Sequence, residues 1–503
     1  MTLEWRQNCM HLFKVLQWWC ILGLIPVAAQ ATTYTVGPTG SDRQYTQLSA
    51  VFAKNDLGPG DIVEVDGNAT YSGGVVVGDD DGGSAGDPVV IRWKRADGAT
   101  RPVLQGGIHT VKFQQSNHVV FEGFEVRGGS NSCLFSEAND VTVRDSVIHD
   151  CPGHGILGAD QLSGSFTLEY SEIYNAGAES NRHPIYMQSD EVAFPDAVFR
   201  MRFNYLHDGN GGNLVKVRHQ RSEIRYNWLE GATYQALELI GPDCYEQQEG
   251  WSAGLKREDA HVVGNVIIQS GNWPNAIRMG GDLNGRSQGR VRLVNNTILF
   301  TRAGAANAVM VQLGAESLEM HNNVIYQTGG GAPTVLKENT VEDTPEPCGP
   351  SSTTPWSGGR KVAGSNNWVQ SSAVSVPSEW TGTVRGTDPH LANIATGQLR
   401  PLADSGLLGQ GNNAPASPLL FPFPSPLALA QYDPPLKVKM EVGGEQARPP
   451  PGRIKIDIGA VARSSGTETE PGSSALETKA RGKFRKSPHI AGTVKFRKLR
   501  RGG

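Results

Sequence analysis

The residues best suited to chemistry lie in short apolar segments in which every second side chain is polar or charged. In NLVKVRH, strict alternation predicts that Val215 and Val217 point inward while Lys216 and Arg218 point outward together. The outward residues of the related segments IYMQ, LEL, AIRMGGD and VMVQL are Tyr186, Gln188, Glu238, Arg278 and Gln312. An arginine can neutralise an anion, and a lysine beside other cations releases its proton more easily. The set therefore predicts an anion-binding surface that includes a lysine base.

A repeated pattern supplies the elements that would position these side chains. Two alternating apolar residues, two further residues and an apolar pair recur from VVFEGFEV at 119–126 to LEMHNNVI at 318–325. The residues at the sixth position are Phe124, Ser146, Ser171, Asn204, Asn227, Asn265, Asn296 and Asn323. Successive positions are at least 22 residues apart, and the number of additional residues varies. This is typical of a solenoid whose coils contain three short strands and whose insertions fall in the turns. The asparagines are expected to form a ladder between coils.

The pattern predicts an all-β protein, a single right-handed parallel β-helix over residues 32–461. A β-sandwich, the structural alternative, would not repeat one consensus eight times. Residues 34–65 predict a first strand, a short capping helix and a first coil, and GSAGDPVVIR at 83–92 leads into another strand. Beyond residue 330 the repeat decays into an irregular C-terminal extension, in which GTDPHL at 386–391 and IDIGAV at 456–461 are predicted to be late strands.

These segments resemble the secreted right-handed β-helix proteins of the pectate-lyase type, a pectin-lyase-like solenoid. The nearest are polysaccharide lyases of the chondroitinase B and alginate lyase kind and their uncharacterised relatives. The resemblance covers about residues 33–461 and rests on PTGSD, LGPGDIVEV, GSAGDPVVIR, HPIYMQ, GGNLVKVRHQRSEIRYNWLEG and DIGAV. It implies β-elimination at a uronate of an anionic polysaccharide.

The resemblance also implies roles for individual residues. Lys216 takes the position of the base, and Arg218 or Arg278 would neutralise charge or assist the leaving group. His183, which opens HPIYMQ, is a candidate acid or substrate contact, while Glu238 opposes the loss of a proton from a neighbouring lysine.

The resemblance raises calcium as a possible cofactor. The chondroitinase B type holds a calcium ion on acidic residues just before the catalytic lysine. Here that stretch offers Asp208, Asn210 and Asn213 without a closely spaced pair of glutamates. Calcium binding therefore stays open, and an arginine could neutralise the substrate instead.

Two other functions stay open. A glycoside hydrolase needs a pair of catalytic carboxylates, and the candidates for it are Glu238, Asp243 and Asp282. The segment GHG at 153–155 is a weak match to a motif of that enzyme class. A non-catalytic carbohydrate-binding or surface β-helix needs no such pair. Neither the sugar nor endo or exo action follows from the sequence.

The two ends of the chain predict export. Residues 1–31 have a basic start, an apolar stretch over 15–28 and the cleavage site Ala29-Gln30-Ala31, typical of a signal peptide. The protein is thus expected to be secreted or periplasmic, with no transmembrane anchor after cleavage. Four cysteines would remain, Cys133, Cys151, Cys244 and Cys348, which allow three pairings. Cys133 and Cys151 lie about one coil apart and could bridge neighbouring coils.

The net charge of −4 averages two different parts. Residues 479–503 contain ten basic and no acidic residues, so the rest has 36 basic against 50 acidic, or −14. Residues 462–503 are therefore predicted to be a disordered linker and basic tail. An acidic body is not expected to bind nucleic acid, and a monomer is expected. Binding of a polyanion would require cations concentrated locally.

Overall fold

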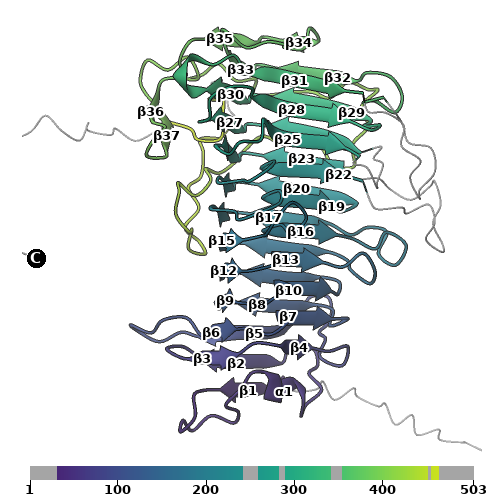
Figure 1. The fold of residues 1–503 in the computed structure, drawn as a ribbon, viewed down its shortest axis with the longest axis vertical. Coiled ribbons are helices and arrows are strands. Elements are labelled where there is room, and N and C mark those ends of the chain that lie inside the picture. Colours follow the sequence, from purple (N-terminus) through teal and green to yellow (C-terminus); the bar gives the residue numbers. More distant parts are fainter. Residues whose placement is uncertain (1–30, 242–258, 282–288, 341–353, 451–454, 464–503) are drawn as a thin grey trace, which may run out of the picture. The chain divides into compact units, whose positions relative to one another are not determined.

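The computed structural model describes residues 31–241, 259–281, 289–340, 354–450 and 455–463. It confirms the predicted all-β fold, a right-handed parallel β-helix with three long parallel sheets (Figure 1). Each full coil contributes one strand to each sheet, in the order sheet 1, sheet 2, sheet 3. The chain divides into two units at residues 463/464, and all the described residues belong to the first. No helix in the described ranges is long and apolar enough to cross a membrane.

Sheet 1 has 13 strands within the described residues. In order they are β1 (Thr33–Val36), β2 (Ile62–Asp66), β5 (Val89–Lys94), β8 (Val119–Glu122), β11 (Val141–Arg144), β14 (Phe166–Glu169), β17 (Phe199–Arg202), β20 (Arg221–Arg225), β23 (Asp259–Val263), β26 (Arg290–Val294), β29 (Ser317–His321), β32 (Val362–Ser365) and β34 (Trp380–Thr381). Their inward side chains stack in columns, as Phe121, Val143, Leu168 and Met201 do in register and fully buried. The predicted alternation therefore builds the core.

Sheet 2 has 12 strands within the described residues. They are β3 (Thr70–Ser72), β6 (Val103–Gln105), β9 (Glu125–Arg127), β12 (Val147–Cys151), β15 (Glu172–Ala176), β18 (Tyr205–Leu206), β21 (Trp228–Leu229), β24 (Val266–Gln269), β27 (Thr297–Phe300), β30 (Val324–Gln327), β33 (Trp368–Gln370) and β35 (Val384–Gly386). A short 3-10 helix, η2 (Thr328–Gly330), follows β30.

Sheet 3 has ten strands within the described residues. They are β4 (Val75–Val77), β7 (His109–Gln114), β10 (Ser132–Glu137), β13 (His154–Gly158), β16 (Ile185–Gln188), β19 (Val215–Arg218), β22 (Leu237–Ile240), β25 (Asn275–Gly280), β28 (Asn307–Gln312) and β31 (Thr334–Asn339). This sheet carries the candidate site.

The predicted asparagine ladder is confirmed at the turn between sheets 1 and 2. Asn204, Asn227, Asn265, Asn296 and Asn323 each donate from Nδ2 to Oδ1 of the next ladder asparagine, at 2.9–3.0 Å. The last acceptor is Asn367, and Ser171 and Ser146 continue the ladder in the other direction. The residue before each ladder position takes the left-handed conformation that the turn needs. The ladder fixes the stacking of the coils.

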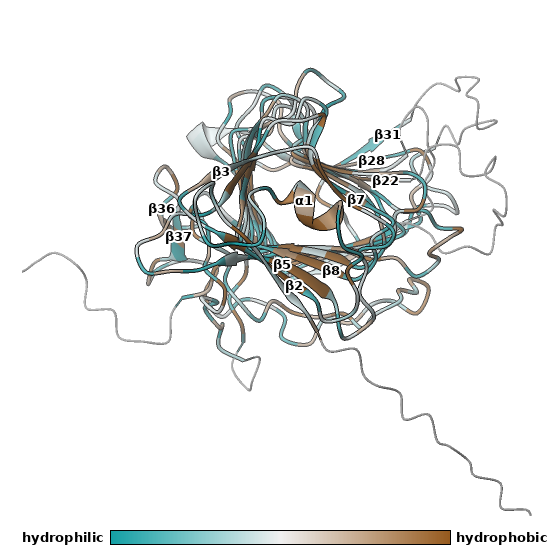
Figure 2. Cartoon of the chain, turned by 90° about the horizontal axis from the view of Figure 1, so that it is seen from below, coloured by the Kyte–Doolittle hydropathy of each residue, from teal (hydrophilic) through white to brown (hydrophobic). Residues whose placement is uncertain are grey.

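The N-terminal end is capped as predicted. The first strand, β1, is followed by the single turn of helix α1 (Ser49–Phe52) and then by β2. Leu48 and Val51 of this segment are fully buried in the main apolar core. Figure 2 shows α1, coloured mainly as apolar, over the space enclosed by the three sheets. The helix therefore covers apolar side chains that the first coil would otherwise expose.

The C-terminal extension differs from the prediction for residues 456–461. Of the segment 386–391, only its first residue lies in β35 and only its last lies in β36 (Leu391–Asn393). Strand β36 pairs antiparallel with β37 (Gln398–Pro401). IDIGAV at 456–461 is not a strand. Its amides bond singly to different segments, from Ile458 to the Leu407 carbonyl and from Gly459 to the Asn322 carbonyl. Its alternating apolar residues pack across the coils, so no strand ladder forms.

A C-terminal strap, residues 412–448, runs back past successive coils (Figure 1, yellow-green), first along sheet 1 and then along the turns between sheets 1 and 2. The Ser417 hydroxyl donates to Glu319 at 2.6 Å, and the Gln431 amide donates to the Tyr226 hydroxyl at 3.1 Å. Lys439 reaches Asp145, 294 residues away in the chain. The strap thus ties together coils that are far apart along the solenoid.

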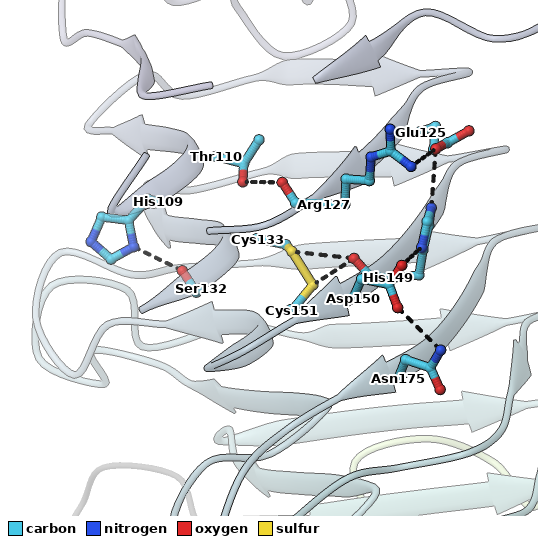
Figure 3. The surroundings of a disulfide bond; sticks show 10 residues. All are labelled: His109, Thr110, Glu125, Arg127, Ser132, Cys133, His149, Asp150, Cys151 and Asn175. Atoms are coloured by element: carbon cyan, nitrogen blue, oxygen red, sulfur yellow. Dashed lines mark hydrogen bonds and ion pairs between the residues drawn. A yellow bond between two sulfur atoms is a disulfide. The ribbon is translucent and has the colours of Figure 1, made fainter. Parts of the chain in front are cut away.

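A disulfide joins Cys133 in β10 to Cys151 in β12, with the Cα atoms 5.8 Å apart. Figure 3 shows the two sulfurs beside the His149 backbone carbonyl. The two strands belong to neighbouring coils, so the predicted bridge between coils is confirmed. The signal segment over 1–30, Cys244, Cys348, Asp243, Asp282 and the tail beyond residue 463 lie outside the described residues.

Candidate active site

The parallel register of sheet 3 stacks outward side chains from successive coils into one column. Tyr186 pairs with Lys216, Lys216 with Glu238, and Glu238 with Arg278. A second column holds Gln188 beside Arg218. The inward neighbours Val215 and Val217 are buried in the core, which fixes the outward direction of Lys216 and Arg218. The structure therefore brings the site residues chosen from the sequence onto one sheet.

Glu238 lies at the centre of this column and is almost completely buried, with 2% of its surface exposed. Arg278 Nη1 is 3.0 Å from Glu238 Oε1, and Asn213 Nδ2 donates to Oε2. Lys216 Nζ is 3.7 Å from Oε2, which is too far for a hydrogen bond. The close contacts of Glu238 are thus with Arg278 and Asn213, and Lys216 is a looser partner. We call these four residues the Glu238 cluster.

Arg218 is 2% exposed and has fixed partners. Its Nε donates to the Tyr186 hydroxyl at 3.0 Å, and its Nη1 donates to the Gly241 carbonyl. Lys216 Nζ lies 5.1 Å from the centre of the Tyr186 ring. Two cations therefore flank one phenol, and Arg218 orients its hydroxyl.

His183 and His154 form a pair of buried, neutral histidines beside Tyr186. His183 Nδ1 accepts from the Asn213 amide at 2.8 Å, and His154 Nδ1 accepts from the His183 amide at 3.1 Å. Each ring must therefore carry its proton on Nε2. Burial, with the Lys216 charge second, lowers the pKa of His183 to about 2, and burial with the Arg182 charge lowers that of His154 to about 4. His183 can donate a hydrogen bond, but it is not an imidazolium acid near neutral pH.

The outer part of the column is held by amides. Gln312 Nε2 donates to the Gly281 carbonyl at 3.2 Å, which also accepts from Arg278 Nη2 at 3.2 Å. Asn339 donates to Gln312 Oε1 at 3.3 Å. These bonds orient the Arg278 guanidinium beside Glu238.

The face is less exposed than the sequence indicated. Gln188 and Gln312 are only 5% and 8% exposed, in addition to the buried Arg218 and Glu238. Among the charged members, the Lys216 and Arg278 side chains are the more accessible, at 15% and 16%. A ligand on this face would meet those two cations first.

The three metal candidates do not fit a calcium site, because their side chains have different surroundings. Asp208 Oδ2 accepts from His207 Nδ1 at 2.7 Å beside sheet 2, and Asn213 Nδ2 donates to Glu238 beside sheet 3. Asn210 is exposed between them. Within the described residues, no group of three or more histidine, cysteine or acidic side chains could hold a metal ion.

Two participants were missed in the sequence. Asn213 was considered only as a metal ligand, yet it bonds to Glu238 and to the His183 ring. His154 was considered only as the centre of the weak hydrolase motif GHG at 153–155, yet its Nδ1 accepts from the His183 backbone amide. Both lie at the N-terminal end of a sheet 3 strand, His154 at the start of β13 and Asn213 just before β19, one coil from the candidate His183.

No protein-family model matches the chain, and no curated protein matches it. The solved structures similar to it include "pectate lyase Pel9A", with 12% identity over 86% of this chain and 96% of that chain and a TM-score of 0.45. An alginate lyase from Paenibacillus sp. str. FPU-7 has 17% identity, coverage of 67% and 96%, and a TM-score of 0.37. A GH136 lacto-N-biosidase from Eubacterium ramulus has 10% identity, coverage of 71% and 67%, and a TM-score of 0.32. At these values none of them indicates what this chain acts on.

Proposed function

We propose that the protein is an exported polysaccharide lyase that cleaves a uronate-containing polymer by β-elimination on the outer face of sheet 3. The observation that carries the proposal is the charge of this face. Among the described residues of this face, the cations Lys216, Arg218 and Arg278 gather around one carboxylate, that of Glu238. The rest of the chain before residue 479 is acidic, so this concentration of cations is what a polyanion would find.

The proposed chemistry gives a separate task to each of several groups on this face. Arg278 binds the uronate carboxylate, onto which charge moves when the C5 proton is removed. Lys216 takes the C5 proton, the C4–C5 double bond forms and the C4–O4 bond breaks. Arg218 holds Tyr186 so that the phenol can donate a proton to the departing O4. His183, as a neutral Nε2–H donor, would contact the sugar.

The disulfide supports the exported location. Disulfides persist in oxidising compartments and are rare in the cytosol. Cys133 and Cys151 are bonded and buried in the core of the solenoid. This agrees with the signal segment proposed for residues 1–31.

The test is a screen of the full chain against alginate, pectate and glycosaminoglycans, read by the ultraviolet absorbance of the unsaturated product. One polymer is expected to give the product, and Lys216→Ala is expected to lower the rate by about 10³-fold, within the range of general acid–base catalysis. Absence of the product with every polymer would contradict a lyase. Polymer binding without cleavage would favour a carbohydrate-binding protein, and cleavage to saturated ends would favour a hydrolase.

Lys112 provides a matched control on the same sheet. It lies in the same outward column, 2.8 Å from Glu137 and 5.3 Å from the centre of the Phe135 ring. Lys112→Ala removes a lysine with a similar glutamate and a similar aromatic partner, several coils away. Its rate should stay within about threefold of the original, which is about 0.65 kcal/mol in activation free energy. An equal loss in both variants would mean that the effect is general and not due to a base at Lys216.

A further inference from the structure

One aromatic side chain of the molecule lies largely in water. Trp273, in the turn between β24 and β25, is 40% exposed, and no other tryptophan, tyrosine or phenylalanine in the described ranges is as exposed. A single exposed apolar residue is common on protein surfaces, so exposure alone assigns nothing. What sets Trp273 apart is the partner of its ring and the way its backbone is held.

Tyr234 is the partner of this ring. It lies one coil earlier, in the turn between β21 and β22, and its ring centre is 5.3 Å from that of Trp273, with 69° between the ring planes. Both side chains keep accessible surface, and the exposed polar residues Thr233 and Asn272 are their neighbours in the chain. We call Tyr234 and Trp273 the aromatic platform. An aromatic surface with a polar rim suits a sugar, whose C–H groups pack on the rings while its hydroxyls stay hydrated.

The backbone of the aromatic platform is held by side chains of neighbouring strands and turns. The fully buried Gln269 of β24 donates from Nε2 to the backbone carbonyls of both platform residues, at 2.7 and 3.0 Å. Arg302, one coil further on, donates from Nε to the Gly271 carbonyl at 2.8 Å and from Nη2 to the Asn272 carbonyl at 2.9 Å. The two turns are therefore fixed relative to each other before a ligand arrives, which lowers the entropy cost of binding.

The aromatic platform also stands at the start of the two strands that carry the centre of the proposed lyase site. Tyr234 is four residues before Glu238 of β22, and Trp273 is five residues before Arg278 of β25. At ~3.3 Å per residue, these separations are roughly 13–17 Å along the strands. That is the length of a few sugar units, so a polymer held at Arg278 can reach the platform with another of its sugars.

We propose that the aromatic platform is a subsite that packs on the C–H face of one pyranose ring of the polymer bound on sheet 3. The identity of this polymer rests on the proposed lyase function. A uronate carries its carboxylate at the edge of the ring and keeps apolar C–H faces, so the same chain can meet the Arg278 guanidinium and the two aromatic rings. Two side chains offer far less area than the ~800 Å² that each partner buries in a stable protein interface, which favours a sugar over a protein.

The experiment measures the affinity of the full chain for alginate, pectate and hyaluronan by calorimetry. At least one polymer is expected to bind, and Trp273→Ala should weaken its binding by about tenfold, because it removes the larger ring of the platform. Trp273→Phe keeps an aromatic face and should stay within about threefold of the original. Ile108→Ala is the matched control, because Ile108 is 68% exposed in the same kind of turn, between β6 and β7, several coils away. It should leave the affinity unchanged.

Three results would overturn the proposal. The first is that no polymer binds to the original chain, and the second is that Trp273→Ala binds as tightly as the original. The third is that Ile108→Ala or Trp273→Phe loses as much affinity as Trp273→Ala. Unsaturated product with an unchanged affinity of Trp273→Ala would reject the platform alone. A loss of affinity in Trp273→Ala without product from any polymer would reject the lyase alone.

Discussion

Two buried carboxylates on different faces of the solenoid have similar partners but connect different parts of the chain. Asp145, which follows β11, is fully buried and bonds to Arg95, to Lys439 and, at 2.7 Å, to Arg101. We call these four residues the Asp145 cluster. The Glu238 cluster on sheet 3 likewise surrounds one buried carboxylate with two cations and one amide. Burial and ion pairing alone therefore do not separate a structural cluster from a catalytic one.

The difference lies in what each cluster joins. The Asp145 cluster ties the strap, through Lys439, to coils that it meets only after folding back along the solenoid. The Glu238 cluster joins adjacent coils that the backbone ladders already hold together. Within the described residues, none of the hydrogen bonds of the strap reaches sheet 3. The difference indicates a role in stability for the Asp145 cluster, and it leaves the Glu238 cluster free for the ligand binding that we propose.

The largest effect is expected from Asp145→Ala. The substitution leaves three cations without their shared carboxylate, and breaking a buried pair costs roughly 3–5 kcal/mol. Urea unfolding of the full chain should show the loss. Asp140→Ala is the control, because Asp140 is half exposed and pairs only with His118, so the change should be about 1 kcal/mol or less. Equal losses of unfolding free energy in the two variants would contradict a special role of the Asp145 cluster in stability.

Arg278→Ala and Arg292→Ala should have opposite consequences. Arg278 is the proposed carboxylate binder, and its removal should lower kcat/KM by about 10²-fold, as for other groups that stabilise developing charge. Arg292 is 3.0 Å from Glu319 and 2.7 Å from the Ser425 carbonyl of the strap. Its removal should lower the melting temperature and leave kcat/KM unchanged. A loss of activity in both variants, or in neither, would remove the functional distinction between the two faces.

The sequence predicted the parts of the molecule that repeat. Alternation placed Lys216, Glu238 and Arg278 outward, and the sixth-position asparagines formed the ladder, because each signal recurs in every coil. Neighbouring coils lie close together whatever their insertions, so spacing allowed the Cys133–Cys151 bridge, while the choice among the three pairings came only from the structure.

The sequence could not predict what packs against the repeat. The strap has no period, and nothing local indicates that Lys439 would meet Asp145. IDIGAV at 456–461 alternates like a strand but finds no neighbouring strand edge, so its amides bond to scattered acceptors. Such contacts depend on tertiary position, which also explains why the burial of Arg218 was missed.

As the pH falls, the buried histidines beside the Glu238 cluster should lose stability first and the Asp145 cluster later. The change in unfolding free energy for each group should be smaller than that of the substitutions above. Burial lowers the pKa of His183 to about 2 and that of His154 to about 4, so the unfolded chain takes up protons below pH 6.5 that the folded chain does not. Their contribution is complete above pH 6.5 and falls with pH, by up to about 1.4 kcal/mol per unit for each histidine. The buried His219 and His261, with pKa values lowered by burial to about 3, act in the same direction.

The Asp145 cluster should respond only at lower pH. Burial favours the protonated form, but hydrogen bonds from Arg101, Lys439 and Arg95 outweigh it and lower the pKa to about 2. The stability from this group is therefore present above its ordinary value of 3.8 and is lost as the pH falls through about 2. Urea midpoints between pH 7 and 4 should decline less steeply in His183→Gln, while Asp145→Asn should lower the curve without changing its slope in that range. A slope that follows Asp145 would mean that the strap contact, and not the histidines beside the Glu238 cluster, controls acid stability.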